Sequence, residues 1–133
     1  MKTPGAPRTG HPYKKLYNRV VKDVVFIGGA DDELRSFPHP ARQRAGYQLY
    51  LVQTGAEPAD WKPMTTIGSG CREIRVRDES GAYRVFYIAT VGDAVYVLHC
   101  FKKKTQRTAK ADLNVGKARY QAMRALIEET KKR

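Results

Sequence analysis

The segment that decides the fold is Val95-Tyr-Val-Leu-His-Cys-Phe101, which runs directly into Lys102-Lys-Lys-Thr-Gln-Arg-Thr-Ala-Lys110. A run of β-branched and aromatic residues without Gly or Pro is typical of a strand. The nine residues that follow it carry five cations and no acid. The sequence therefore predicts a buried strand with dense positive charge where the chain leaves the sheet, which suits a polyanionic partner.

Three other segments upstream also have strand character. Residues 72–77 and 83–90 are followed by turn-forming sequences at 78–81 and 92–93 respectively, which predicts an antiparallel meander with the strand at 95–101. A short β-branched strand at 24–27 ends at two glycines.

Helical patterns occupy much of the remaining chain. We expect a short helix from about Asp31 through Phe37, a second from about Pro40 to Gln53, and a last one from about Ala109 to Thr130. Residues 54–70 are polar and rich in Gly and Pro, which indicates a long connection. The predicted order is β-α-α-β-β-β-α, a small α+β fold with an antiparallel-rich sheet and the helices on one face.

The whole chain has the size and composition of one small domain. Its 133 residues carry 25 basic and 13 acidic side chains, a net charge of +12. This imbalance favours a nucleic-acid, ribosomal or acidic-protein partner, with an anionic membrane surface as the weaker alternative. Residues 1–22 contain six cations, no acid and several Pro and Gly, so we expect a flexible basic arm before a domain at 23–133.

Several common signals are missing from the sequence. There is no apolar run of ~20 residues and no apolar secretory core, so we expect a cytoplasmic protein without a membrane partner. Cys71 and Cys100 make neither a disulfide framework nor a metal-ligand cluster, and we expect both to be small buried residues. No nucleotide-cofactor, zinc or hydrolase motif is present, and we expect no cofactor.

Alternation along the strands predicts the candidate site. Arg75 and Arg77 share one face of their strand, and pairing with the next strand can put Arg84 on that same open face. Clustered guanidiniums repel one another, and they offer planar bidentate donors that suit phosphate. A solvated strand face with scattered salt bridges is the alternative interpretation.

Lysines and one histidine complete the set of candidates. Lys102, Lys103 and Lys104, with Arg107 and Lys110, are expected to contact phosphate, although a solubilising loop would have the same composition. His99 could transfer a proton near neutral pH, or it could be a satisfied core histidine. No acidic constellation for magnesium is apparent, so any phosphodiester cleavage is expected to be metal-independent.

Several of these segments together resemble a known family. Val24-Val-Phe-Ile-Gly28, Asp31-Asp-Glu-Leu-Arg-Ser-Phe-Pro38 and Ala41-Arg-Gln-Arg-Ala-Gly-Tyr-Gln-Leu-Tyr50 resemble the start of phage-derived, HigB-like toxins of the RelE/ParE superfamily. The strand sequences around Arg75 and Arg84, and the exit from the strand at 95–101, are similar to the later part of these toxins. The resemblance covers roughly residues 24–130.

The resemblance implies the toxin of a type II toxin–antitoxin pair, with a ribosome-dependent endoribonuclease activity on mRNA. It implies that Arg75 and Arg84 are catalytic and that Lys102 to Lys104 lie near the basic residues after the last strand. Glu73 stands where the RelE pattern has a lysine, and no tyrosine closely follows the lysine cluster, so proton transfer would fall to His99 or a lysine such as Lys102. The expected partners are the ribosome, mRNA and an antitoxin, commonly a helix-turn-helix protein.

Two other functions remain open at this point. The chain could be a non-enzymatic, ParE-like inhibitor of gyrase, in which the arginines would be dispensable for growth arrest. It could also be a catalytically inactive nucleic-acid-binding remnant of a phage gene, which would cause no arrest.

Overall fold

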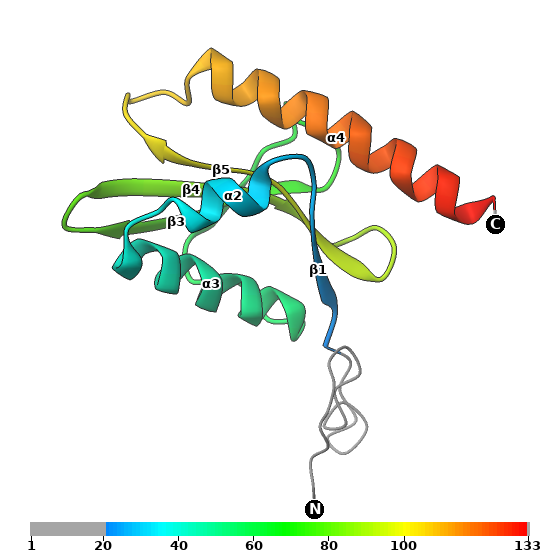
Figure 1. Ribbon diagram of the computed structural model, residues 1–133, viewed down its shortest axis with the longest axis horizontal. Helices are drawn as coiled ribbons and strands as arrows, with labels where there is room; N and C mark the ends of the chain where they lie inside the picture. Colours follow the sequence, from blue (N-terminus) through cyan, green and yellow to red (C-terminus); the bar gives the residue numbers. More distant parts are fainter. Residues whose placement is uncertain (1–20, 133) are drawn as a thin grey trace, which may run out of the picture.

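A computed structural model describes residues 21–132 of the chain (Figure 1). Most of the expected basic arm at 1–22 lies outside these residues. The described part contains five strands and three helices, in the order β1 (Asp23–Phe26), α2 (Ala30–Arg35), α3 (His39–Gln53), β2 (Trp61–Pro63), β3 (Cys71–Asp78), β4 (Gly81–Ile88), β5 (Ala94–Lys103) and α4 (Lys110–Lys131). The predicted α+β class is confirmed.

All five strands form one mixed sheet in the order β1-β5-β4-β3-β2. The β3–β4 and β4–β5 pairs are antiparallel, so the predicted meander is confirmed. β1 adds to the other edge of β5 in parallel, with Val24 opposite Val95. An irregularity between Phe86 and Tyr87 shifts the register of β4 against β5.

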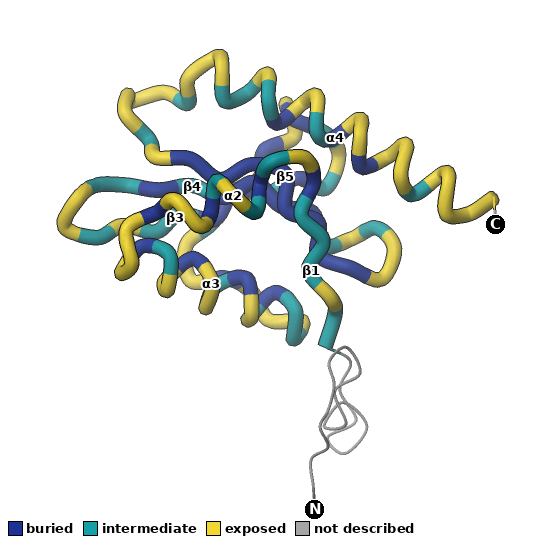
Figure 2. Tube along the Cα trace, viewed as in Figure 1, coloured by how far each residue is buried: buried dark blue, intermediate teal, exposed yellow. Residues whose placement is uncertain are grey.

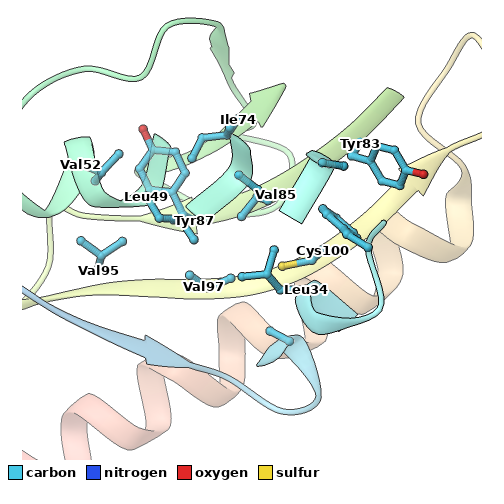
Figure 3. Packing of buried hydrophobic residues seen from close by; sticks show 14 residues of the cluster. Leu34, Leu49, Val52, Ile74, Tyr83, Val85, Tyr87, Val95, Val97 and Cys100 are labelled. Carbon is cyan, nitrogen blue, oxygen red and sulfur yellow. The ribbon is translucent and has the colours of Figure 1, made fainter. Parts of the chain in front are cut away.

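The helices cover both faces of this sheet, and the prediction that they share one face is wrong. Figure 1 shows α3 and α4 on opposite sides of the strands. One core lies between the sheet and α2 and α3, where the Tyr87 ring packs near Leu49 and Val52 (Figure 3). The other core includes Tyr120 and Met123 of α4. The helices divide in this way because β4 and β5 are apolar on both faces and need cover on both.

The connection expected at 54–70 also differs from the prediction. Trp61–Pro63 forms β2, a short edge strand that pairs antiparallel with β3. Beyond it, Met64 and Ile67 are buried in the core beneath α4. The Trp61 ring stacks under the Arg72 guanidinium, which lies 3.9 Å from the ring centroid. The segment is therefore a packed part of the fold.

β5 lies between β1 and β4 in the sheet and runs further than predicted. Its first eight residues, Ala94 to Phe101, are all buried, which appears as a continuous dark segment in Figure 2. The strand continues through Lys102 and Lys103, so these two cations belong to the sheet itself. At this end Lys103 pairs with Ala82 near the β3–β4 turn.

Within residues 21–132, none of the helices combines the length and the apolar character needed to cross a bilayer.

Candidate phosphate-binding groove

The floor of the candidate site is formed by two arginines on adjacent strands. Arg75 of β3 lies directly opposite Arg84 of β4 in the antiparallel register. Their neighbours Ile74 and Val85 point into the core beneath α3, so alternation directs both arginines to the face that α4 covers further along. The prediction that Arg75 and Arg84 share a face is confirmed.

Lysines from both sides bring further positive charge to these arginines. Lys103 of β5 and Lys62 of β2 line the same groove, which has a volume of about 630 Å³. The loop before α4 forms one wall and the segment after β2 forms the other. The lining residues are Lys62, Pro63, Met64, Thr65, Thr66, Arg75, Arg84, Lys103, Gln106, Arg107, Thr108 and Leu113.

One carboxylate lies against the cations of the groove. Glu73 is only 1% exposed, and its Oε1 lies 3.4 Å from Nε of Arg75 and 3.7 Å from Nε of Arg84. The second distance allows electrostatic attraction but is too long for a hydrogen bond. Both Glu73 Oε2 and Arg84 Nε are buried without a hydrogen-bond partner among the described residues.

The pKa values of two cations in the groove, Lys103 and Arg84, lie below their ordinary values. Partial burial lowers the pKa of Lys103, and the neighbouring charges of Arg84, Lys62 and Arg75 lower it further, against an opposing effect of Glu73. Burial is also the largest cause that lowers the pKa of Arg84, although a guanidinium stays protonated at any physiological pH. Lys103 is thus the groove residue best suited to releasing a proton.

The remaining cations of the predicted site spread over a wider area. Lys102 points to the opposite face of β5, where its ammonium lies 5.9 Å from the centroid of the Tyr83 ring. Lys102, Lys103 and Lys104 also line a neighbouring cavity of about 320 Å³ next to the groove. Arg107 lies in the groove wall. Arg77 is exposed two residues along β3 from Arg75, and Lys110 is exposed at the start of α4.

His99 lies on the face of the arginines but is not available to a substrate. It is 6% exposed, and its Nδ1 and Nε2 lie 2.9 Å from Glu33 Oε1 and 2.7 Å from Asp112 Oδ1. Its ring also stacks on Phe101, with centroids 4.8 Å apart. These contacts are those of a satisfied core histidine, which is one of the two interpretations that the sequence allows.

The network around His99 joins three elements. Glu33 of α2 also accepts hydrogen bonds from the Cys100 amide at 3.0 Å and from Arg119 of α4 at 2.8 Å. Arg119 donates in addition to the Leu98 carbonyl. Glu33 and Arg119 therefore bond to the backbone of β5 beyond the end of its parallel partner β1.

Sequence reasoning misses three parts of this arrangement. It places Lys62 in a connection, it treats Glu73 only as a departure from a family pattern, and it does not link Glu33 and Asp112 to His99. The one available signal is that Glu73 stands two residues before Arg75, because alternation places these two side chains on the same face of the strand. Across residues 21–132, no group of three His, Cys, Asp or Glu side chains could hold a metal ion.

Comparison with known proteins identifies the family of the chain. No curated protein matches the chain. The model of the family described as "Phage derived protein Gp49-like (DUF891)" matches residues 32–121. This match runs from α2 into α4 and includes Glu73, Arg75, Arg84 and Lys103. The chain belongs to the Gp49-like family of phage-derived proteins.

Proposed function

We propose that this protein is the toxin of a type II toxin–antitoxin system and cleaves mRNA on the ribosome. The observation that carries the proposal is the convergence of Arg75, Arg84 and Lys103 on one open groove. The association of the Gp49-like family with RelE- and HigB-type toxins supports it. The protein would act in the cytoplasm, where ribosomes and mRNA are found.

Cleavage of RNA requires groups that stabilise negative charge and a group that donates a proton, and the groove contains two arginines and a lysine suited to these roles. In RNA the 2′-hydroxyl releases its proton to solvent water as its oxygen attacks the adjacent phosphorus, a cyclic phosphate forms, and the bond to the 5′-oxygen of the next nucleotide breaks. Negative charge builds up on the phosphate oxygens, and the leaving oxygen needs a proton. We assign charge stabilisation to Arg84 and Arg75 and the donation of the proton to Lys103, whose pKa is lowered by burial and by the surrounding cations.

The overall charge supports the proposed partners. A net charge of +12 favours association with ribosomal RNA, and the attraction weakens with salt. Arg107 in the groove wall and the exposed Lys104 and Lys110 nearby in sequence would contact flanking phosphates. An antitoxin, for which we propose a helix-turn-helix protein, would neutralise the activity.

The test is the substitution Arg84→Ala, with Arg35→Ala as the matched control. Arg35 is exposed on α2 and forms only a surface ion pair with Asp31, so its loss should be neutral. Arg84→Ala should slow cleavage by roughly 10²–10³ and relieve growth arrest upon expression. The readout is the mapping of mRNA ends in ribosomes after brief induction, together with a check that each variant is folded.

The other outcomes select the competing functions. A folded Arg84→Ala protein that still arrests growth, with intact mRNA and damaged DNA, would support a gyrase inhibitor and reject the endonuclease. A wild-type protein that binds RNA but neither arrests growth nor cuts mRNA would be an inactive nucleic-acid-binding remnant.

A further inference from the structure

Glu73 is the most deeply buried carboxylate among the described residues, and it lies against two arginines of the cationic groove. Burying a charge is costly unless it is well paired and hydrogen-bonded. Glu73 has only a long contact to Arg75, a longer one to Arg84, and an Oε2 atom without a hydrogen-bond partner among the described residues. Its pairing is therefore poor for its burial.

The cations of the groove account for a carboxylate at this position. Arg75 and Arg84 are cross-strand neighbours, and Lys103 lies with them in the same groove. Three like charges at such close range repel one another, and the described residues that line the groove include no acidic side chain. Glu73 places a negative charge directly against two of these cations, and Asp60 acts more weakly on Arg84.

We propose that Glu73 is an internal counter-ion whose place at Arg75 and Arg84 is taken by a phosphate group of the ligand. The carboxylate and a phosphodiester compete for the same two guanidiniums, so Glu73 sets how tightly the groove binds an anion. Because the contacts of Glu73 with the two arginines are long, little interaction energy is lost when a phosphate replaces the carboxylate. The inference rests on the proposed function for its ligand, single-stranded RNA, whereas the competition applies to any phosphate group.

The experiment removes the charge of Glu73 and measures affinity without cleavage. The probe is a fluorescently labelled, single-stranded RNA of about five nucleotides with 2′-O-methyl groups, followed by anisotropy at fixed salt. Glu73→Gln keeps the size of the side chain and should tighten binding by roughly thirtyfold, the effect of one unit charge at about 8 Å and an effective dielectric constant near 20.

Glu57→Gln is the matched control. Glu57 also pairs with an arginine of β3, at 2.8 Å from Arg72, and its substitution changes the net charge by the same amount. Its side chain is 64% exposed and does not line the groove, so binding should change less than twofold. A folded Glu73→Gln protein that binds the probe no more tightly than Glu57→Gln would overturn the proposal.

A second pair of variants keeps the proposal testable if Glu73→Gln does not fold. Arg75→Gln combined with Glu73→Gln removes both members of the pair, which relieves the repulsion that the single change would leave. The double variant should bind the probe several-fold more tightly than Arg75→Gln alone, and equal or weaker binding would reject the counter-ion role.

The dependence of probe binding on Arg84 tests the RNA site, and its dependence on Glu73 tests the counter-ion. If the wild-type protein does not bind the probe in a manner that depends on Arg84, the RNA site is wrong. If binding depends on Arg84 but is indifferent to Glu73, the RNA site stands and the counter-ion is rejected.

Discussion

The carboxylate of Glu33 holds three elements of the fold together, and removing its charge should destabilise the protein markedly. A single oxygen, Oε1, accepts hydrogen bonds from the Cys100 amide at 3.0 Å, His99 Nδ1 at 2.9 Å and Arg119 at 2.8 Å. The substitution Glu33→Gln keeps the shape and the accepting oxygen but loses the charge. It therefore isolates the electrostatic part of the network.

The size of the effect follows from the three contacts. Hydrogen bonds to an ionised group are roughly twice as strong as neutral ones, and the difference is about 1 kcal/mol for each. Arg119 would also lose its counter-charge in a partly buried setting. We expect Glu33→Gln to lower the free energy of unfolding by about 3 kcal/mol near neutral pH, a large share of the stability of a small domain.

The pH dependence of this difference has a definite sign. Burial raises the pKa of Glu33, but Arg119, the Cys100 amide and His99 lower it by more, so it lies below its ordinary value of 4.5. A carboxyl group whose pKa is lowered by folding stabilises the protein fully above its unfolded pKa. That stabilisation disappears as the pH falls from about 4.5 through the lower pKa of the folded state.

Urea unfolding followed by circular dichroism at about pH 6.5 and about pH 3 tests both points. Asp31→Asn is the control, because Asp31 lies on the same helix and makes only an exposed ion pair with Arg35, so its loss should cost less than about 0.5 kcal/mol. If Glu33→Gln costs no more than this control at pH 6.5, or if its cost is undiminished at pH 3, the charge of Glu33 does not stabilise the fold in this way.

Three further predictions concern packing, thiol chemistry and binding. Gly68→Ala would place its Cβ 2.4 Å from the Tyr120 ring and should lower the melting temperature. Gly46→Ala meets nothing within 4 Å at an exposed position of α3 and should stabilise the protein by about 0.5–1 kcal/mol, and a thermal melt that ranks the two variants the other way contradicts the packing. The Cys71 thiol, whose pKa burial raises to about 12, should react with a thiol reagent at about pH 8 only after denaturation, and rapid labelling of the folded protein would refute this. Lys103→Ala should reduce the slope of log affinity for single-stranded RNA against log salt by about 0.7, and an unchanged slope would remove Lys103 from the contact.

The parts of the fold that the sequence predicts well are those with a clear period. In β3 the alternation of Ile74 with Arg75 and of Val76 with Arg77 is unambiguous, so the pattern of residues alone identifies the face of the arginines. Likewise Ala41, Ala45, Leu49 and Val52 recur at helical spacing, and all four are buried in α3.

The parts that could not be predicted lack such a period. β5 is buried along both faces from Ala94 to Phe101, so its sequence does not tell which helix covers which side, and the expectation of one shared face is wrong for α4. β2 has only three residues, ends at Pro63 and follows a polar stretch, so it has almost no strand pattern. The partners of His99 could not be predicted from a local pattern. They are Glu33 of α2 and Asp112 of α4, which meet His99 only once both helices have docked on the sheet.

The parallel pairing of β1 with β5 has a consequence for protein synthesis. β1 and α2 emerge from the ribosome before β5, on which their partners lie, and the contact of Glu33 with Cys100 spans 67 residues. β3, β4 and β5 are joined by short turns and can pair first, since local contacts form faster than distant ones. A nascent chain that stops after β4 has neither β5 nor Lys103, so the basic groove can assemble only after β5 and the start of α4 have been synthesised.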